Sequence, residues 1–155
     1  MLSSTYEIED MKKELEPYNI YDYKEETKFQ TDLEYAIDTA KFERMEPVIG
    51  EDQYDALEAL DKTGLSTTEL YVYRAEVYFA IAEFYLLHGR RDKYRRRAAR
   101  ESRTQGDVTF STLGTIGKEM AANDYIEKAK WSLAEGGYDF QQGVRLQRRT
   151  SIHGS

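Results

Sequence analysis

The chain has 155 residues, 33% of them charged and 40% hydrophobic, and a formal net charge of -7. These proportions are typical of one soluble domain with a modest core. No apolar run approaches the roughly 20 residues that a membrane-spanning helix needs, and the sequence opens without a signal-peptide pattern. The absence of cysteine excludes disulfides, thiol catalysis and thiolate metal sites, and favours a cytoplasmic protein.

Two capping boxes predict the first two helices. Ser4-x-x-Glu7 precedes apolar residues at helical spacing, and that helix is expected to end before Pro17. Thr31-x-x-Glu34 precedes a second apolar stripe, which is expected to stop before Pro47. A short helix over residues 51–62 follows, and Gly64 occupies the glycine position that commonly ends a helix.

The central stretch, residues 68–103, is an apolar helix that leads into a basic cluster. One stripe at helical spacing comprises Leu70, Tyr73, Val77, Ala80, Ile81, Phe84 and Leu87. The stripe beside it comprises Tyr71, Ala75, Tyr78, Ala82 and Tyr85. A helix that is apolar nearly all round is covered by its own domain or by partners. We interpret the first stripe as core and the tyrosines as an interface between subunits, because tyrosine tolerates a wet edge. The alternative is that both stripes are core.

Gly89 is expected to break or bend this helix before the basic residues begin. The candidate contact residues of this cluster are Arg90, Arg91, Arg95, Arg96, Arg97 and Arg100. They suit the carboxylates of a neighbouring copy, because guanidinium forks pair well with carboxylates. They also suit a phosphate backbone, where charge alone supplies affinity.

The charge of the chain is strongly divided. Residues 1–69 hold 19 acidic and 7 basic side chains, whereas residues 70–155 hold 10 acidic and 15 basic ones. The first part therefore carries -12 and the second +5. A subunit with this division can present opposite charges to two neighbours, or to copies of itself head to tail.

Residues 104–117 lack helix formers and are bracketed by glycines, so we expect an extended loop or an irregular hairpin. A last helix is predicted over residues 117–134, followed by a flexible tail. The expected fold is therefore mainly α, a small helical bundle with one long central helix. Its helical domain covers residues 1–135, and a C-terminal arm covers residues 136–155.

Nothing in the sequence indicates an enzyme. His88 and His153 are the only histidines, and no cysteine completes a metal set with them. No phosphate-binding glycine loop or nucleophile motif is present. We expect no catalysis, no metal and no cofactor.

The order of the elements is similar to that of the head–tail connector (adaptor or head-completion) proteins of tailed bacteriophages. The resemblance rests on the N-terminal helix that begins Tyr6-Glu7-Ile8, the alanine-rich helix, the long central helix and the stretch Gln105-Gly106-Asp107-Val108-Thr109-Phe110-Ser111. This last stretch resembles the glycine-aspartate loop that the family places between its last two long helices.

The resemblance implies a structural subunit of the virion neck, assembled in the host cytoplasm. Such subunits form a ring, usually of twelve copies, that docks on the portal protein and extends the DNA channel toward the tail. The implied partners are other copies of the chain, the portal, the next neck or tail-completion protein, and DNA passing through without sequence specificity. Gly106, Asp107 and Phe110 would be loop contacts. The portal-docking arm would comprise Tyr138, Phe140, Arg145, Arg148 and Arg149.

The alternative function is a small helical nucleic-acid-binding or regulatory protein that uses the cluster from Arg90 to Arg103 on phosphates. The acidic balance of the whole chain and the absence of a recognition motif argue against it.

Overall fold

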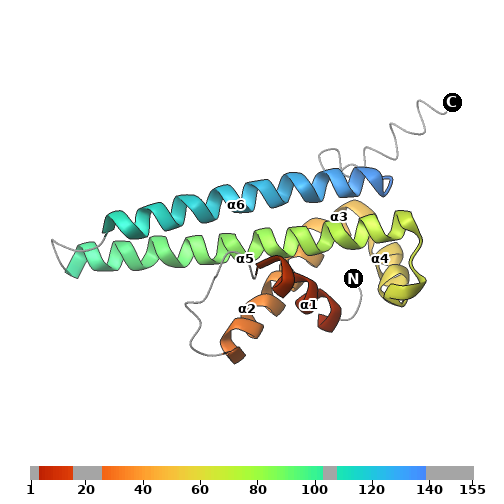
Figure 1. The fold of residues 1–155 in the computed structure, drawn as a ribbon, viewed down its shortest axis with the longest axis horizontal. Helices are drawn as coiled ribbons and strands as arrows, with labels where there is room; N and C mark the ends of the chain where they lie inside the picture. Colours follow the sequence, from red (N-terminus) through yellow and green to blue (C-terminus); the bar gives the residue numbers. More distant parts are fainter. Residues whose placement is uncertain (1–3, 16–25, 103–107, 139–155) are drawn as a thin grey trace.

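The computed structural model describes residues 4–15, 26–102 and 108–138, and these ranges contain helices and no strand (Figure 1). The predicted mainly α fold with one long helix is confirmed. The elements in chain order are α1 (Ser4–Leu15), α2 (Glu26–Thr39), the π-helical turn η2 (Ala40–Met45), α3 (Glu46–Ile49), α4 (Glu51–Glu58), the 3-10 turn η3 (Lys62–Gly64), α5 (Thr67–Ser102) and α6 (Val108–Glu135).

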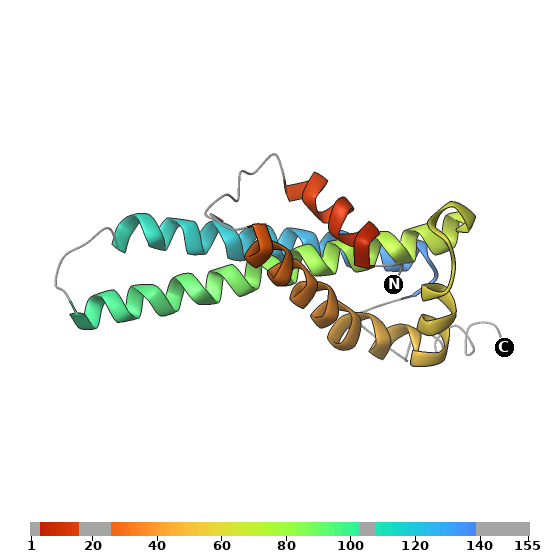
Figure 2. The same cartoon turned by 90° about the horizontal axis from the view of Figure 1, so that it is seen from below.

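The helices form three layers with α5 in the middle. α6 runs antiparallel to α5 along one side, while α1 and α2 cover the other side (Figures 1 and 2). The 36 residues of α5 span about 54 Å at 1.5 Å per residue. Only part of this length is covered by the smaller helices. The outer part of the α5–α6 hairpin, on the left in Figure 1, has none of α1 to α4 beside it.

α5 begins with a capping box. The Glu69 N–H donates to Ser66 Oγ over 3.2 Å, and the Ser66 N–H donates to Glu69 Oε1 over 2.9 Å. Hydrogen bonding of the Glu69 carboxylate to the Ser66 N–H first, and to the Ser66 side chain second, holds the pKa of Glu69 below its ordinary value. Ser66 is therefore the N-cap of α5.

The core lies along α5, where the predicted stripe is largely buried. Of its members, Ala80, Ile81 and Phe84 are fully covered, and Tyr73 is 2% exposed. Phe79, which lies outside the predicted stripe, is also fully covered. α1 contributes Ile8, Met11 and Leu15, the three residues that its apolar period placed inward. α2 contributes Leu33, Ala36 and Ile37. Leu70 lies at the half-buried margin of this core.

Two expectations about breaks in the long helices are wrong. α5 passes through Gly89 without interruption and continues to Ser102. Gly89 is buried, and a Cβ added there would lie 3.9 Å from Glu119 Cγ of α6. A glycine inside a helix costs about 1 kcal/mol relative to alanine, and packing against α6 offsets that cost.

The predicted extended loop is also wrong for most of its length. Residues 108–117 are the first turns of α6, so the helix begins nine residues before the expected start at Gly117. Residues 104–107 of the predicted loop lie outside the described ranges. Valine, threonine and glycine are weak helix formers, but packing along a long partner helix outweighs such small preferences.

The helix around residues 26–49 differs from its predicted bounds at both ends. α2 begins at Glu26, so Thr31 lies inside it and donates its hydroxyl to the Thr27 carbonyl over 2.9 Å. At the other end Pro47 does not stop the helix. It lies in the first turn of α3, directly after η2, where a residue without an N–H is tolerated.

The next helix is shorter than predicted. It was expected to reach Lys62, but α4 ends at Glu58.

α6 ends in a Schellman motif. Gly137 has φ +93°, the Tyr138 N–H donates to the Leu133 carbonyl over 2.8 Å, and the Gly137 N–H donates to the Ala134 carbonyl over 3.0 Å. Tyr138 packs partly buried against the core. The folded body therefore continues three residues beyond the predicted boundary at residue 135.

Gly136 allows α6 to approach α5 closely, which gives a testable prediction. A Cβ at Gly136 would lie 2.6 Å from Val72 Cγ2, so Gly136→Ala should lower the free energy of unfolding by about 1–3 kcal/mol. Gly117→Ala on the same helix meets nothing within 4 Å and should raise it by about 0.5–1 kcal/mol. Urea unfolding of both variants measures the difference, and equal effects would show that the close approach does not matter.

Candidate interaction surfaces

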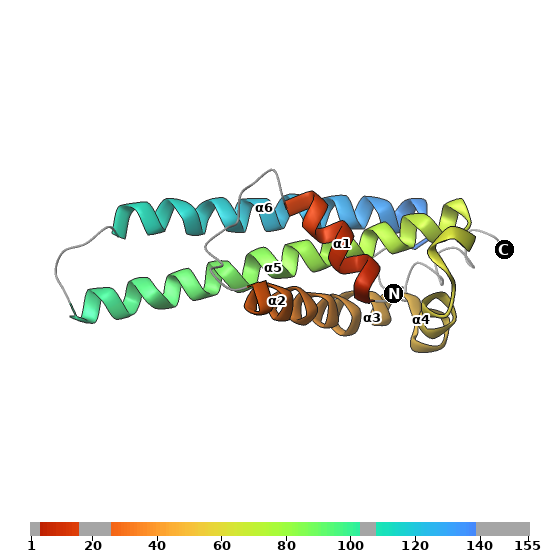
Figure 3. The same ribbon diagram turned by 60° about the horizontal axis from the view of Figure 1, so that its bottom comes forward.

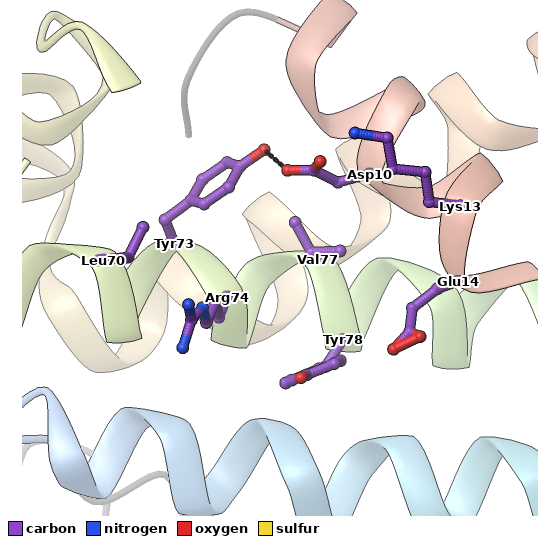
Figure 4. Close-up of a pocket in the computed structure, with 8 residues that line it drawn as sticks. All are labelled: Asp10, Lys13, Glu14, Leu70, Tyr73, Arg74, Val77 and Tyr78. Atoms are coloured by element: carbon purple, nitrogen blue, oxygen red, sulfur yellow. Dashed lines mark hydrogen bonds between the residues drawn. The ribbon is translucent and has the colours of Figure 1, made fainter. Parts of the chain in front are cut away.

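A cleft of about 440 Å³ lies between α1 and α5. Figure 4 shows its floor on α5 and its wall on α1. Leu70 and Val77 line it together with Asp10, Lys13, Glu14, Tyr73, Arg74 and Tyr78. The Tyr73 hydroxyl donates to Asp10 Oδ2 over 2.8 Å. Burial, together with the Asp10 carboxylate, raises the pKa of Tyr73 far above its usual range, so the hydroxyl keeps its proton. This bond ties α1 to α5 beside the cleft.

A buried carboxyl pair lies where α1, α4 and α5 meet. Glu7 and Glu76 are 1% and 0% exposed, and their side chains hydrogen-bond. The Tyr54 hydroxyl of α4 donates to Glu76 Oε1. Desolvation first, and then the hydrogen bond and charge of Glu76, raise the pKa of Glu7 well above its ordinary value. Glu7 is therefore not the solvated cap that its sequence position predicts. Instead its carboxyl is buried between α1 and α5, and burial makes it keep its proton to a higher pH than an exposed glutamate does.

The pair gives the protein a pH-dependent stability. Below the ordinary glutamate pKa of about 4.3, Glu7 is protonated in both the folded and the unfolded chain. The stabilisation that the neutral Glu7 side chain gives the folded state is then fully present. As pH rises to the raised pKa, the unfolded state ionises first, and about 1.4 kcal/mol is lost for each unit between the two values. We expect Glu7→Gln to keep the hydrogen bond to Glu76 and to reduce the fall in melting temperature as pH rises. Glu9→Gln, on the exposed side of α1, should leave that fall unchanged. A wild-type profile with no fall above pH 5 would contradict the pairing.

Two ion pairs join α2 and η2 to α5. Arg91 donates to both carboxylate oxygens of Asp32, over 2.6 and 3.0 Å, and Asp32 is 5% exposed. Arg44 of η2 places Nη2 2.8 Å from Glu83 Oε1, and Glu83 is also 5% exposed. The order of these contacts shows that α2 runs antiparallel to α5. Sequence reasoning missed both pairs, although an acidic residue within the apolar part of α5 is a signal for a buried partner.

The predicted basic cluster is divided by this arrangement. Arg91 is held by Asp32, whereas Arg90 is exposed. Arg95, Arg96, Arg97 and Arg100 lie on the helical backbone of α5, and the positions of their side chains are outside what the structure describes. The structure therefore removes Arg91 from the group available to a partner and leaves the use of the others as a prediction.

The tyrosine stripe of α5 faces α6 of the same chain, which corrects its interpretation as an interface between subunits. The Tyr71 ring meets Trp131 edge-on with centroids 5.9 Å apart. The Tyr78 and Tyr85 rings each lie 6.0 Å from the Tyr125 ring. Tyr85 is 6% exposed and Tyr78 is half-buried. These contacts support the alternative interpretation, in which both stripes of α5 are core, because α6 is long enough to cover the second one.

The remaining predicted contact residues lie mostly outside the described ranges. This holds for Gly106 and Asp107 and for the arm residues Phe140, Arg145, Arg148 and Arg149. Phe110 belongs to the first turn of α6, so it is not a loop residue, and its side chain is not described. Tyr138 is partly buried against the body.

Several large apolar side chains of the described part are exposed. Tyr35 and Phe42 lie on the outer side of α2 and η2, with exposed fractions of 53% and 59%. Met120 and Trp131 lie on α6, with exposed fractions of 63% and 59%. Since α2 and α6 lie on opposite sides of α5 (Figure 3), the subunit exposes aromatic surface on two different sides. The sequence predicted none of these exposed positions. The apolar spacing of the last helix predicts that Met120 points inward, and that prediction is wrong.

Among residues 4–15, 26–102 and 108–138 there is no group of acidic, histidine or cysteine side chains placed to hold a metal ion. In the same ranges no helix is long and apolar enough to cross a membrane. Comparisons of the chain with protein-family models, with curated proteins and with solved structures found no match.

Proposed function

We propose that this chain is a structural subunit of a phage neck. In this proposal it forms a head–tail connector ring that docks on the portal protein and extends the DNA channel toward the tail. It acts by binding other proteins and not by catalysis. The sequence resemblance to connector proteins is one support.

The observation that carries the proposal is the uncovered outer part of the α5–α6 hairpin (Figure 2). A helical hairpin of this length is stable only where its sides are covered. α1 to α4 cover it over part of its length, and the uncovered part contains the most basic stretch of the chain, residues 93–100. The opposite end of α5 adjoins α4, where Glu51, Asp52, Asp55 and Glu58 are exposed. A subunit with opposite charges at its two ends suits repeated head-to-tail contact.

The experiment is to mix the full chain with the portal protein of its own phage and to measure the mass of the complex. We expect a defined number of copies, about twelve, added to each portal ring. A portal that binds no copies would contradict the proposal. If the chain instead binds duplex DNA of arbitrary sequence, with affinity that falls steeply between 50 and 200 mM salt, the nucleic-acid-binding alternative replaces it.

A further inference from the structure

We propose that the outer surface of α2 and η2 is the docking site for the basic end of α5 from a second copy of this chain. This inference rests on the proposed function and names the two surfaces through which neighbouring subunits meet. The docking surface, called the α2 face below, consists of Glu34, Tyr35, Asp38, Phe42 and Glu43, all of them exposed.

The α2 face combines uncovered aromatic rings with negative charge. Tyr35 of α2 and Phe42 of η2 each expose more than half of their surface. Three exposed carboxylates lie beside them. The nearest lysine of the same helix, Lys41, is occupied by Glu58 at 3.4 Å and also lies over the Phe42 ring at 5.2 Å. The face therefore suits a partner that brings cations able to stack on aromatic rings.

Residues 92–102 of α5 supply that chemistry. They contain five basic side chains against two acidic ones, and four of the five are arginines. Arginine pairs with carboxylates through two parallel hydrogen bonds and also stacks on aromatic rings. The rest of the chain offers no comparable basic stretch on a described helix, because Lys and Arg elsewhere alternate with acidic residues.

The geometry requires that the two surfaces come from different copies. Asp32, near the start of α2, contacts Arg91, and Arg44, beyond its end, contacts Glu83. The α2 face therefore lies beside the part of α5 that precedes Arg91. Beyond Arg91 the straight helix carries residues 92–102 away from α2. The basic end of one copy thus reaches outward, where it meets the α2 face of the next.

Such a contact is heterologous, because one surface meets a different surface of the neighbour. Heterologous contacts close into a ring when a whole number of identical rotations from copy to copy adds up to 360°. Otherwise they build open filaments. The α2 face lies on the side of α5 opposite α6, so it leaves the exposed Trp131 and Met120 of α6 free for another component.

A charge-swap experiment with the full chain tests this inference. The first variant reverses the face (Glu34→Lys, Asp38→Lys, Glu43→Lys), and the second reverses the helix end (Arg95→Glu, Arg96→Glu, Arg97→Glu). We expect each variant alone to lose at least ten-fold in self-association measured by sedimentation, with helical circular dichroism and melting temperature retained. Mixing the two should restore assembly in alternating order, because each reversed surface then meets its complement.

The outcomes separate this inference from the proposed function. If the wild type assembles and the face-reversed variant assembles equally well, the α2 face is not the docking site, and the ring proposal stands. The same conclusion follows if the mixture fails to restore assembly. If only the helix-end variant loses function, and the function lost is DNA binding, the basic end meets phosphates and the inference is overturned. If the wild type stays monomeric alone and on the portal, both proposals fail.

Discussion

Phe84→Ala is expected to lower the free energy of unfolding by about 3–5 kcal/mol, a large part of the stability of a domain of this size. Phe84 is fully buried at the centre of α5. Its ring meets Phe29 edge-on at 5.7 Å and lies 4.5 Å from the His88 ring. Truncation removes these contacts and leaves a cavity between α2 and α5. Chemical unfolding of the dilute protein measures the loss.

Phe42→Ala is the matched control, since it makes the same chemical change on an exposed ring. Phe42 keeps 59% of its surface in contact with solvent, so its truncation should change the free energy of unfolding by less than about 0.5 kcal/mol. The docking proposal adds that Phe42→Ala weakens self-association. Equal destabilisation by the two substitutions would show that α2 is not packed on α5 as described.

Arg44→Met is expected to lower the free energy of unfolding by about 1–3 kcal/mol, the cost of leaving a buried acceptor without its partner, because Glu83 is buried while Arg44 is partly exposed. Two guanidinium nitrogens of Arg44, Nε and Nη2, lie 3.0 and 2.8 Å from Glu83 Oε1, and Glu83 is 5% exposed. Arg44 also lies over the Phe79 ring at 5.8 Å. The substitution leaves a carboxylate among apolar side chains without its arginine.

The double variant Arg44→Met with Glu83→Leu separates the free energy of the ion pair from the free energy of packing around η2. Replacing both partners with apolar side chains of similar volume is often neutral or stabilising, so the double variant should recover most of the loss. A double variant as unstable as Arg44→Met alone would place the cost in lost packing around η2, and the ion pair would contribute little.

The apolar spacing of the chain was enough to predict most of the helices and the buried sides of α1 and α5. Ile8, Met11 and Leu15 of α1 point inward as their spacing predicts, and so do Tyr73 and Phe84 of α5. Such patterns succeed because burial of apolar area dominates the free energy of folding. The positions at which α5 and α6 begin and end were less predictable. Gly89 and residues 108–117 are poor helix formers that remain helical, because the two long helices support each other over their length.

The buried charges could not be located from local patterns. Glu7 fits a capping box and Asp32 fits a solvated helix face, yet both are buried by partners distant in sequence. A partial signal was available in α5, where Glu76 and Glu83 stand seven residues apart within an apolar stretch. A carboxylate in such a stretch is expected to have a hydrogen-bonding partner, because burial without one is costly. Which residue is the partner depends on how α1 and η2 pack.

The candidate surfaces were predicted in part. The division of charge between the two parts of the sequence led to the expectation of head-to-tail contact, and the structure adds a defined acidic face at α2. The interpretation of the tyrosine stripe failed because it required knowing that α6 is long enough to cover Tyr78 and Tyr85.

The central claim, that copies of this chain assemble head to tail into a closed ring, is tested most directly by the native mass of the wild-type protein. The measurement should cover concentrations from about 1 to 100 μM, the range expected for interfaces of modest affinity. We expect one closed species of defined size, with twelve copies, that dissociates to monomer in high salt because opposite charges join the copies. A protein that stays monomeric at every concentration, with the portal present as well as without it, or an open-ended series of masses, would contradict it.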